Sequence, residues 1–271
     1  MNLPTTPPPF AFHPGTAPLL ISFPHVGTHI PPALAERLTP KAREVNDTDW
    51  HLPRLYDFAR GLGASLLIAT HSRYVIDLNR PLDGTSLYPG QSVTALCPVD
   101  DFDGERIYLD VADEPGEAEI AERRATCWQP YHDALTAELA RIRAAHGVAV
   151  LWDAHSIRSV LPRFFDGQLP DLNLGTADGA SCAPELAQEL LAVAESAPGF
   201  TAVLNGRFKG GHITRAHGHP QGGVHAVQLE MTQRSYMQEA MPFDYLPGQA
   251  ARIQPTLQRL LQTALAFARE P

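Results

Sequence analysis

Short apolar runs alternate along the chain with segments whose apolar residues recur at helical spacing. The run VAVLW at 148–152 is typical of a strand buried on both faces, and it breaks into polar residues at Asp153. Helical spacing is clearest over 117–146, where Gly147 ends the segment. Further strands are predicted at 19–23, 64–69, 172–174, 201–204 and 224–231, a small hairpin around 107–109, and further helices at 31–38, 52–61, 184–196 and 248–268.

This alternation of strands and helices predicts an α/β fold with a mixed, largely parallel sheet. The sequence contains no internal repeat and no composition break, so we expect residues 1–271 to form a single catalytic domain. Residues 1–17 are rich in proline and predict an extended arm. Residues 81–115 have little periodicity and predict a long active-site loop.

Composition narrows the classes of partner. The formal net charge of -9 disfavours nucleic acid and anionic membranes, which reward basic surfaces. No apolar run reaches the roughly 20 residues of a membrane span, and the N-terminus lacks the pattern of a signal peptide. The three cysteines, Cys97, Cys127 and Cys182, are odd in number and far apart, which predicts free thiols and a cytoplasmic location.

Four predicted strands are followed or ended by polar side chains: His25, the group from Arg73 to Arg80, His155 and Glu230. In an open α/β sheet ligands bind beyond the carboxyl ends of the strands. Two histidines and a carboxylate are a typical catalytic zinc ligand set, and a further carboxylate can act as the base.

The third ligand is either Asp49 or Asp47, although each is equally a natural N-cap for the helix that follows. Each histidine could instead have a structural role, and Glu230 could pair with an arginine. Ser156 beside His155 lacks the G-x-S-x-G context of a nucleophile.

Several motifs together resemble the N-formylglutamate amidohydrolase family over about residues 19–237. They are FPHVGTHIP, DTDWHLPRLYDFA, SRYVIDLNRP, LWDAHSIRS, LPDLNLGTADGASC, NGRFKGGHITR and VQLEMTQ. The DLNR segment also resembles the substrate-binding motif of the aspartoacylase group, and these families are similar in fold to zinc carboxypeptidases. The resemblance implies a three-layer α/β/α domain, one zinc ion (Zn2+), and hydrolysis of the small dianion N-formyl-L-glutamate to formate and L-glutamate in histidine degradation.

By position in these motifs, the resemblance implies that His25 and His155 are metal ligands and that Glu230 is the general base. It favours Asp49 over Asp47, because Asp49 directly precedes the tryptophan and the LPRLY helix. The chain departs from the family pattern at His29 and His212, which we therefore do not interpret as ligands.

A substrate with two carboxylates needs cationic partners, and the planar fork of arginine suits a carboxylate. Arg80 is the first candidate and Asn79 supports it. Arg73, Arg158 and Arg215 are candidates for the second carboxylate or for the oxyanion, although each could instead pair with an acid of the surface.

Three other interpretations stay open at this point. The chain could be a zinc amidohydrolase that acts on another N-acyl amino acid or on a peptide C-terminus. It could be a metal-free, anion-binding protein. The ligand types also suit iron, cobalt or manganese.

Overall fold

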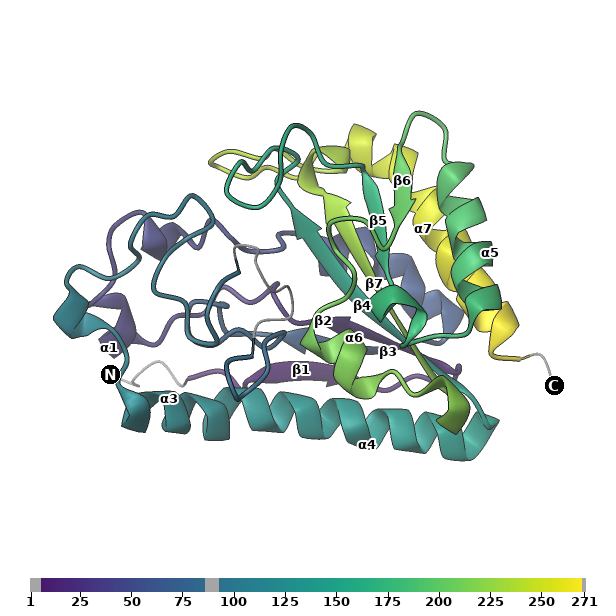
Figure 1. Cartoon of the computed structure of the whole chain (residues 1–271), viewed down its shortest axis with the longest axis horizontal. Coiled ribbons are helices and arrows are strands. Elements are labelled where there is room, and N and C mark those ends of the chain that lie inside the picture. The colour runs from purple at the N-terminus through teal and green to yellow at the C-terminus, as the bar shows by residue number, and fades with distance from the viewer. Residues whose placement is uncertain (1–5, 86–92, 270–271) are drawn as a thin grey trace.

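The computed structural model describes residues 6–85 and 93–269. A seven-stranded sheet with the order β1-β3-β2-β4-β7-β5-β6 runs through these residues (Figure 1). β1 pairs antiparallel with β3 and β5 pairs antiparallel with β7, whereas the other neighbouring strands are parallel. The predicted mixed, largely parallel sheet is thus confirmed. The strands are β1 (Phe10–His13), β2 (Leu19–Phe23), β3 (Ser65–Ala69), β4 (Ala149–Ile157), β5 (Leu172–Gly175), β6 (Ala202–Leu204) and β7 (Val224–Thr232).

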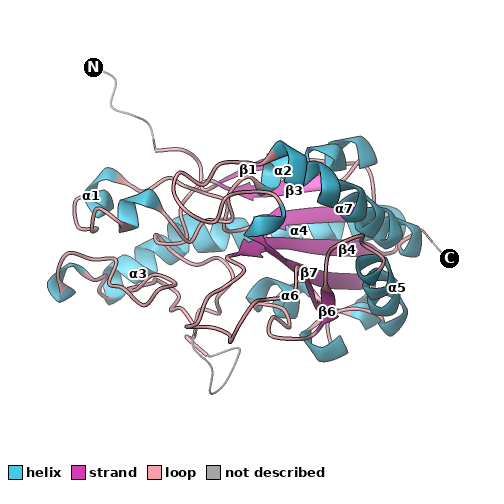
Figure 2. Ribbon diagram, turned by 90° about the horizontal axis from the view of Figure 1, so that it is seen from above, coloured by secondary structure: helices cyan, strands magenta, loops and turns pink. Residues whose placement is uncertain are grey.

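Helices cover both faces of the sheet. α5 and α7 pack together on one face, and α4 runs along the other (Figure 1). Loops and short helices extend from one end of the sheet (Figure 2). The helices are α1 (Pro32–Ala35), α2 (Leu52–Leu55), α3 (Glu117–Arg123), α4 (Gln129–His146), α5 (Pro184–Glu195), α6 (His212–His217) and α7 (Pro247–Phe267).

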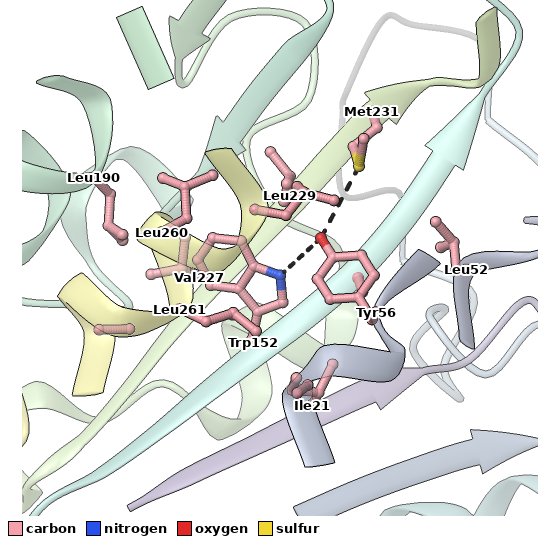
Figure 3. Packing of buried hydrophobic residues seen from close by; sticks show 14 of the residues in the cluster. Ile21, Leu52, Tyr56, Trp152, Leu190, Val227, Leu229, Met231, Leu260 and Leu261 are labelled. Carbon is pink, nitrogen blue, oxygen red and sulfur yellow. Dashed lines mark hydrogen bonds between the residues drawn. The ribbon is translucent and has the colours of Figure 1, made fainter. Parts of the chain in front are cut away.

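Each face of the sheet has its own hydrophobic core. On the α5/α7 face, Trp152 of β4 packs among leucines of both helices, and its Nε1 donates a hydrogen bond to the Tyr56 hydroxyl at 3.3 Å (Figure 3). On the α4 face, Leu151 of β4 packs with Leu135 and Ile142 of α4. Because side chains alternate along a strand, β4 supplies both cores.

The strand predicted at 148–152 is longer than expected. β4 continues to Ile157, so Asp153 and His155 lie within the strand and not after it. The cause is pairing: β4 stays in parallel register with β7 as far as Ile157 opposite Thr232. The polar residues therefore replace core residues on one face of a continuing strand.

The helix predicted over 117–146 is interrupted. A π-helical turn, η4 (Arg124–Trp128), separates α3 from α4. Pro130 at the start of α4 explains the position of the turn, because proline lacks the N–H that would bond the carbonyl of residue 126 and its ring clashes with that carbonyl.

Three other predicted segments differ in detail. The helix predicted from residue 52 is divided into α2 and a 3-10 helix, η2 (Asp57–Leu62). Part of the proline-rich arm forms the edge strand β1, whereas residues 1–5 lie outside the described residues. In the described part of 81–115 one short 3-10 helix, η3 (Val111–Asp113), is the only named element. The small hairpin expected around 107–109 lies slightly earlier: Asp100 and Arg106 form an isolated antiparallel bridge, and Ile107 N donates to the Val99 carbonyl at 3.0 Å. Residues 86–92 lie outside the description. None of the described helices has the length and apolar character needed to cross a membrane.

Candidate metal centre and substrate cavity

The site is built on the α4 face of the sheet, where the two central strands change from apolar to polar residues. On β4, Ala149 and Leu151 are followed on the same face by Asp153 and His155. On β7, Gln228 and Glu230 lie directly opposite that pair in the parallel register. Strand pairing thus places an imidazole beside a carboxylate, both buried.

His25, Asp49 and His155 meet at one buried point. Their candidate ligand atoms all lie within 4.8 Å of one another. Asp49 Oδ2 is 3.1 Å from His155 Nδ1 and 3.8 Å from His25 Nδ1. The turn after β2 carries His25, and Gly27 allows this turn to pack closely, since a Cβ there would lie 2.2 Å from the carbonyl oxygen of His71.

Each imidazole also contacts a second carboxylate through its other nitrogen. His25 Nε2 donates to Asp77 Oδ1 at 2.7 Å, and His155 Nε2 lies 3.0 Å from Asp153 Oδ2. Such a carboxylate fixes the ring with its Nδ1 lone pair directed toward the ligand point. Neither Asp77 nor Asp153 is among the ligands and substrate-binding residues predicted from the sequence. The available signal was their position, two residues before Asn79 and His155 respectively in extended or alternating segments.

The two candidate acids Asp47 and Asp49 have different surroundings. Asp47 accepts hydrogen bonds from the Tyr74 hydroxyl and the Phe102 backbone, both at 2.8 Å, and it does not belong to the ligand cluster. Neither acid caps α2, because the capping position is His51, whose backbone is left-handed with φ of 61°. The geometry therefore brings Asp49, and not Asp47, to the two histidines.

The two histidines differ in their affinity for a proton. Burial, aided by Arg73, lowers the pKa of His25 despite the nearby Asp77. Burial also disfavours protonation of His155, but Asp153 and Asp49 outweigh it and hold the pKa of His155 well above its usual value. A cation that binds at this point therefore competes with protonation of His155, since a ligand nitrogen must be unprotonated.

Glu230 is a buried carboxyl group beside the cluster. Burial raises the pKa of Glu230 to about 8; Asp49 and Asp153 act in the same direction, whereas His155 and Arg73 oppose them. Gln228 Nε2 donates to Glu230 Oε2 at 3.3 Å. A carboxyl group whose pKa lies near neutrality can both accept and return a proton.

The cluster opens into a cavity with about 580 Å³ of empty space, the open solvent at its mouth included. Three of the predicted substrate-binding residues line it, Arg73, Asn79 and Arg80. Arg73 is buried and donates to Asp77 Oδ2 at 2.6 Å, whereas Arg80 donates through Nε and Nη2 to Thr94 at 2.9 and 2.8 Å. The apolar part of the wall is Val93, Phe102, Ile157, Phe164 and Phe208.

The other two predicted arginines are not among the residues that line this cavity. Arg158 donates to Asp103 Oδ1 at 2.7 Å, and Arg215 Nε donates to the carbonyl of Gly210 at 3.0 Å. Arg207, a less certain candidate on the sequence, does line the cavity, and its Nε donates to the carbonyl of Phe164 at 2.6 Å.

The two unexpected histidines lie outside the ligand cluster. The ring of His29 packs edge-on against His71, with 4.7 Å between centroids. His212 lies at the start of α6, near Trp128 and His132. Neither belongs to the cluster formed by the described residues.

The donor set fits a divalent transition metal. Two imidazoles and one carboxylate leave a fourth position open, which is typical of catalytic zinc sites. The two rings also have the carboxylate partners that metal-binding histidines usually have. His25, Asp49 and His155 are therefore the residues of the described chain that would hold such an ion.

Comparisons with known proteins agree on one family. The family model described as N-formylglutamate amidohydrolase matches residues 17–237. The chain is 52% identical over 264 residues to an N-formylglutamate deformylase of Pseudomonas aeruginosa, with 96% of this chain and 97% of that protein covered. It is 51% identical over 260 residues to an N-formylglutamate deformylase of Pseudomonas putida, with the same coverage.

A solved structure supports the fold over the whole chain. The crystal structure of an N-formylglutamate amidohydrolase from Ralstonia eutropha JMP134 has a TM-score of 0.81 at 26% identity, with 96% of this chain and 98% of that chain covered. The gene product Atu2144 from Agrobacterium tumefaciens, with a TM-score of 0.71 at 22% identity and 97% of both chains covered, has the same fold.

Proposed function

Because the chain belongs to the N-formylglutamate amidohydrolase family, we propose that it hydrolyses N-formyl-L-glutamate to formate and L-glutamate with one divalent metal ion. The observation that carries the proposal is the buried cluster of His25, Asp49 and His155, which lies with Glu230 and three arginines in a single cavity. In this proposal the whole chain is one catalytic domain, because one sheet supports both cores and the site.

Glu230 is the general base in this proposal. When bound, an ion such as zinc would polarise the formyl carbonyl and lower the pKa of a water molecule to about 7. Glu230 takes a proton from the attacking water and returns it to the amide nitrogen as the C–N bond breaks. Its raised pKa suits both steps, because the carboxyl group holds and releases a proton near neutral pH.

The arginines bind the two carboxylates of the substrate. Arg80 and Asn79 hold one carboxylate at the cavity wall, and Arg73 supplies positive charge deeper in the site. Arg73 is a fixed charge because it is buried against Asp77, which also contacts His25. Asp77 therefore contacts both a proposed substrate-binding residue, Arg73, and a proposed metal ligand, His25.

Zinc is the proposed ion because two histidines and an aspartate with an open position are a zinc ligand set. We further propose that the reaction belongs to histidine degradation and takes place in the cytoplasm, as the sequence resemblance implies. The three cysteines are buried free thiols, which is consistent with a reducing compartment.

The direct test is formate release from N-formyl-L-glutamate by purified protein, before and after chelation and again with zinc restored. We expect activity to disappear with the chelator and to return with zinc. N-acetyl- and N-succinyl-L-glutamate serve as matched substrates. Turnover of one of these in place of the formyl compound would assign a different acyl specificity, and no turnover by folded, metal-loaded protein would refute the proposal.

A further inference from the structure

The DLNR segment, residues 77–80, is held from behind by the helix that contains the π turn. Leu78, Asn79 and Arg80 each have a partner for the backbone carbonyl. His132 Nε2 donates to the Leu78 carbonyl at 2.8 Å, and Trp128 Nε1 donates to the Arg80 carbonyl at 3.1 Å. The Asn79 carbonyl accepts from Arg80 Nη1 at 3.1 Å.

Trp128 and His132 act as one unit. They lie four residues apart on the helix, the spacing at which side chains are neighbours. Their rings stack with 3.7 Å between centroids and 18° between planes. Both are buried, and their donors point at two carbonyls of one short segment. The backbone of residues 78–80, which includes two residues of the cavity wall, is thus hydrogen-bonded to a stacked pair of rings.

The hydrogen-bond partners of His132 determine its tautomer. Since the Leu78 carbonyl only accepts, Nε2 of His132 carries the proton and Nδ1 is an acceptor. His217 Nε2 lies 3.2 Å from this Nδ1 and supplies the matching donor. Two hydrogen bonds between uncharged groups therefore connect His217 of α6 to His132, and His132 to the Leu78 carbonyl.

Because of the π turn, one helical stretch can donate hydrogen bonds to both ends of residues 75–80, at the Val75 and Arg80 carbonyls. Arg123, five residues before Trp128, donates to the Val75 carbonyl at 2.8 Å. In a regular α-helix, residues five apart point about 140° away from each other. In a π turn, which is hydrogen-bonded from residue i to i+5, they lie on the same side. Arg123 and Trp128 both face residues 75–80 for this reason.

The opposite side of Asn79 is held by the start of α6. Ile213 N donates to Asn79 Oδ1 at 2.8 Å, and a Cβ on Gly211 would lie 2.3 Å from Asn79 Nδ2. Asn79 Nδ2 also donates to Asp153 Oδ2 at 3.3 Å, and this carboxylate contacts His155. A small shift of residues 78–80 would thus move both the cavity wall and a contact of the metal centre.

We propose that Trp128 and His132, presented by the π turn, are positioning residues that fix Asn79 and Arg80 for binding of the substrate carboxylate. The inference rests on the proposed function, because it assigns Asn79 and Arg80 to that carboxylate. Neither ring lines the cavity, so the effect on substrate is transmitted through the backbone of residues 78–80.

The first experiment compares Trp128→Phe with Trp152→Phe. Both variants keep an aromatic ring and remove one indole N–H that donates to a buried oxygen, the Arg80 carbonyl in one case and the Tyr56 hydroxyl in the other. We expect Trp128→Phe to raise KM for N-formyl-L-glutamate about tenfold, because an unpaired buried carbonyl shifts to find a partner, with kcat within about threefold of wild type. Trp152→Phe should leave KM unchanged.

Two readouts independent of turnover accompany the kinetics. Titration calorimetry with L-glutamate should show the same loss of affinity for Trp128→Phe, and bound zinc per chain should stay at the wild-type value in both variants. Equal KM and equal glutamate affinity in the two variants would overturn the proposal. Absence of formate release by wild-type protein would instead refute the proposed function, so the two failures are distinguishable.

A second pair of variants tests the proposal should Trp128→Phe fail to fold. His132→Phe keeps a stacked ring but removes the donor to the Leu78 carbonyl, whereas the Gln side chain in His132→Gln retains an N–H donor at a similar distance. We expect His132→Phe to raise KM and His132→Gln to return KM to within about threefold of wild type. Identical KM values for the two variants would contradict a positioning role.

Discussion

The two faces of the central strands β4 and β7 share one backbone but carry different kinds of side chain. On the α5/α7 face, β4 and β7 present Val150, Trp152, Val227 and Leu229, all of which are fully buried among apolar side chains. On the α4 face, the same strands change toward their carboxyl ends to polar residues, among them His155 of the candidate metal cluster and Glu230, the proposed base. One face therefore fixes the position of the strands, and the other uses that position for chemistry.

The difference shows why the site lies inside the sheet and not only in the loops. Adjacent residues such as Leu229 and Glu230 share one backbone but belong to different environments. A packed core does not adjust easily, so the apolar face of β4 and β7 fixes the separation of His155 and Glu230. Substitutions on the two faces should accordingly separate stability from activity.

The largest effect is expected for Glu230→Gln on the polar face. The amide cannot accept the proton of water, so turnover should fall by about 10²- to 10⁴-fold. Zinc content and the melting temperature should stay close to wild type, since size and hydrogen-bonding capacity change little. Formate release measured together with bound zinc would check this, and turnover near the wild-type level would exclude Glu230 as the base.

The adjacent residue on the apolar face gives the converse result. Leu229→Ala removes a fully buried side chain and leaves a cavity, which should lower the free energy of unfolding by about 2–5 kcal/mol. Below the unfolding transition, kcat and KM should equal those of wild type. Urea denaturation and steady-state kinetics measure the two quantities. A loss of kcat comparable with that of Glu230→Gln would mean that the faces are not separable.

The arginines sharpen the comparison within the polar face. Arg80→Ala should raise KM for N-formyl-L-glutamate about 10- to 100-fold, because a charge-assisted contact to a carboxylate is lost. Arg158→Ala is the matched control, since Arg158 pairs with Asp103 and does not line the cavity. Equal changes in KM for both variants would remove Arg80 from the substrate site.

The carboxylates behind the histidines should influence metal affinity. Asp153→Asn should weaken zinc binding about 10- to 100-fold, because the negative charge that fixes the His155 ring is lost. Asp171→Asn is the control: Asp171 is a buried acid, but it contacts Thr201, Thr232 and Arg234 away from the site. Competition with a chromogenic chelator gives the affinities, and equal zinc affinity in both variants would contradict the role assigned to Asp153.

The apolar face is also the part of the fold that the sequence predicts well. Runs such as 148–152 and 224–231 indicate strands locally, because burial on both faces needs an unbroken apolar stretch. The extension of β4 through His155 is not visible locally, since it depends on pairing with β7, more than seventy residues later. The π turn had a local cause in Pro130, whereas the way it aligns Arg123 with Trp128 follows only from the tertiary structure.

Some residues of the candidate site could likewise be predicted from the sequence, and others could not. Histidines after or within apolar strands identify His25 and His155, and the distance between Asp49 and these rings selects it over Asp47. Asp77 and Asp153 could not be assigned from the sequence, because their role depends on which nitrogen of each ring faces inward. Arg207 lines the cavity and Arg158 does not, because loop packing decides which of these side chains reaches the cavity.

The smallest expected effect is a pH dependence of stability that arises from the histidines on the polar side. Burial lowers the pKa of His132 to about 3 and that of His217 to about 4, from 6.5 in the unfolded chain. Between pH 6.5 and these values the unfolded state binds more protons, so the stability contributed by each neutral ring is complete above pH 6.5 and is lost as the pH falls. The groups that face the pair are Trp128, His212 and the Leu78 carbonyl, with Asp153 acting on His217.

From pH 7 to pH 5.5 the wild type should lose about 1 kcal/mol more of its unfolding free energy than His217→Gln, which retains an N–H donor for His132 but does not titrate. Urea denaturation at the two pH values measures the difference, and equal losses in the two proteins would show that His217 is not held neutral by the fold.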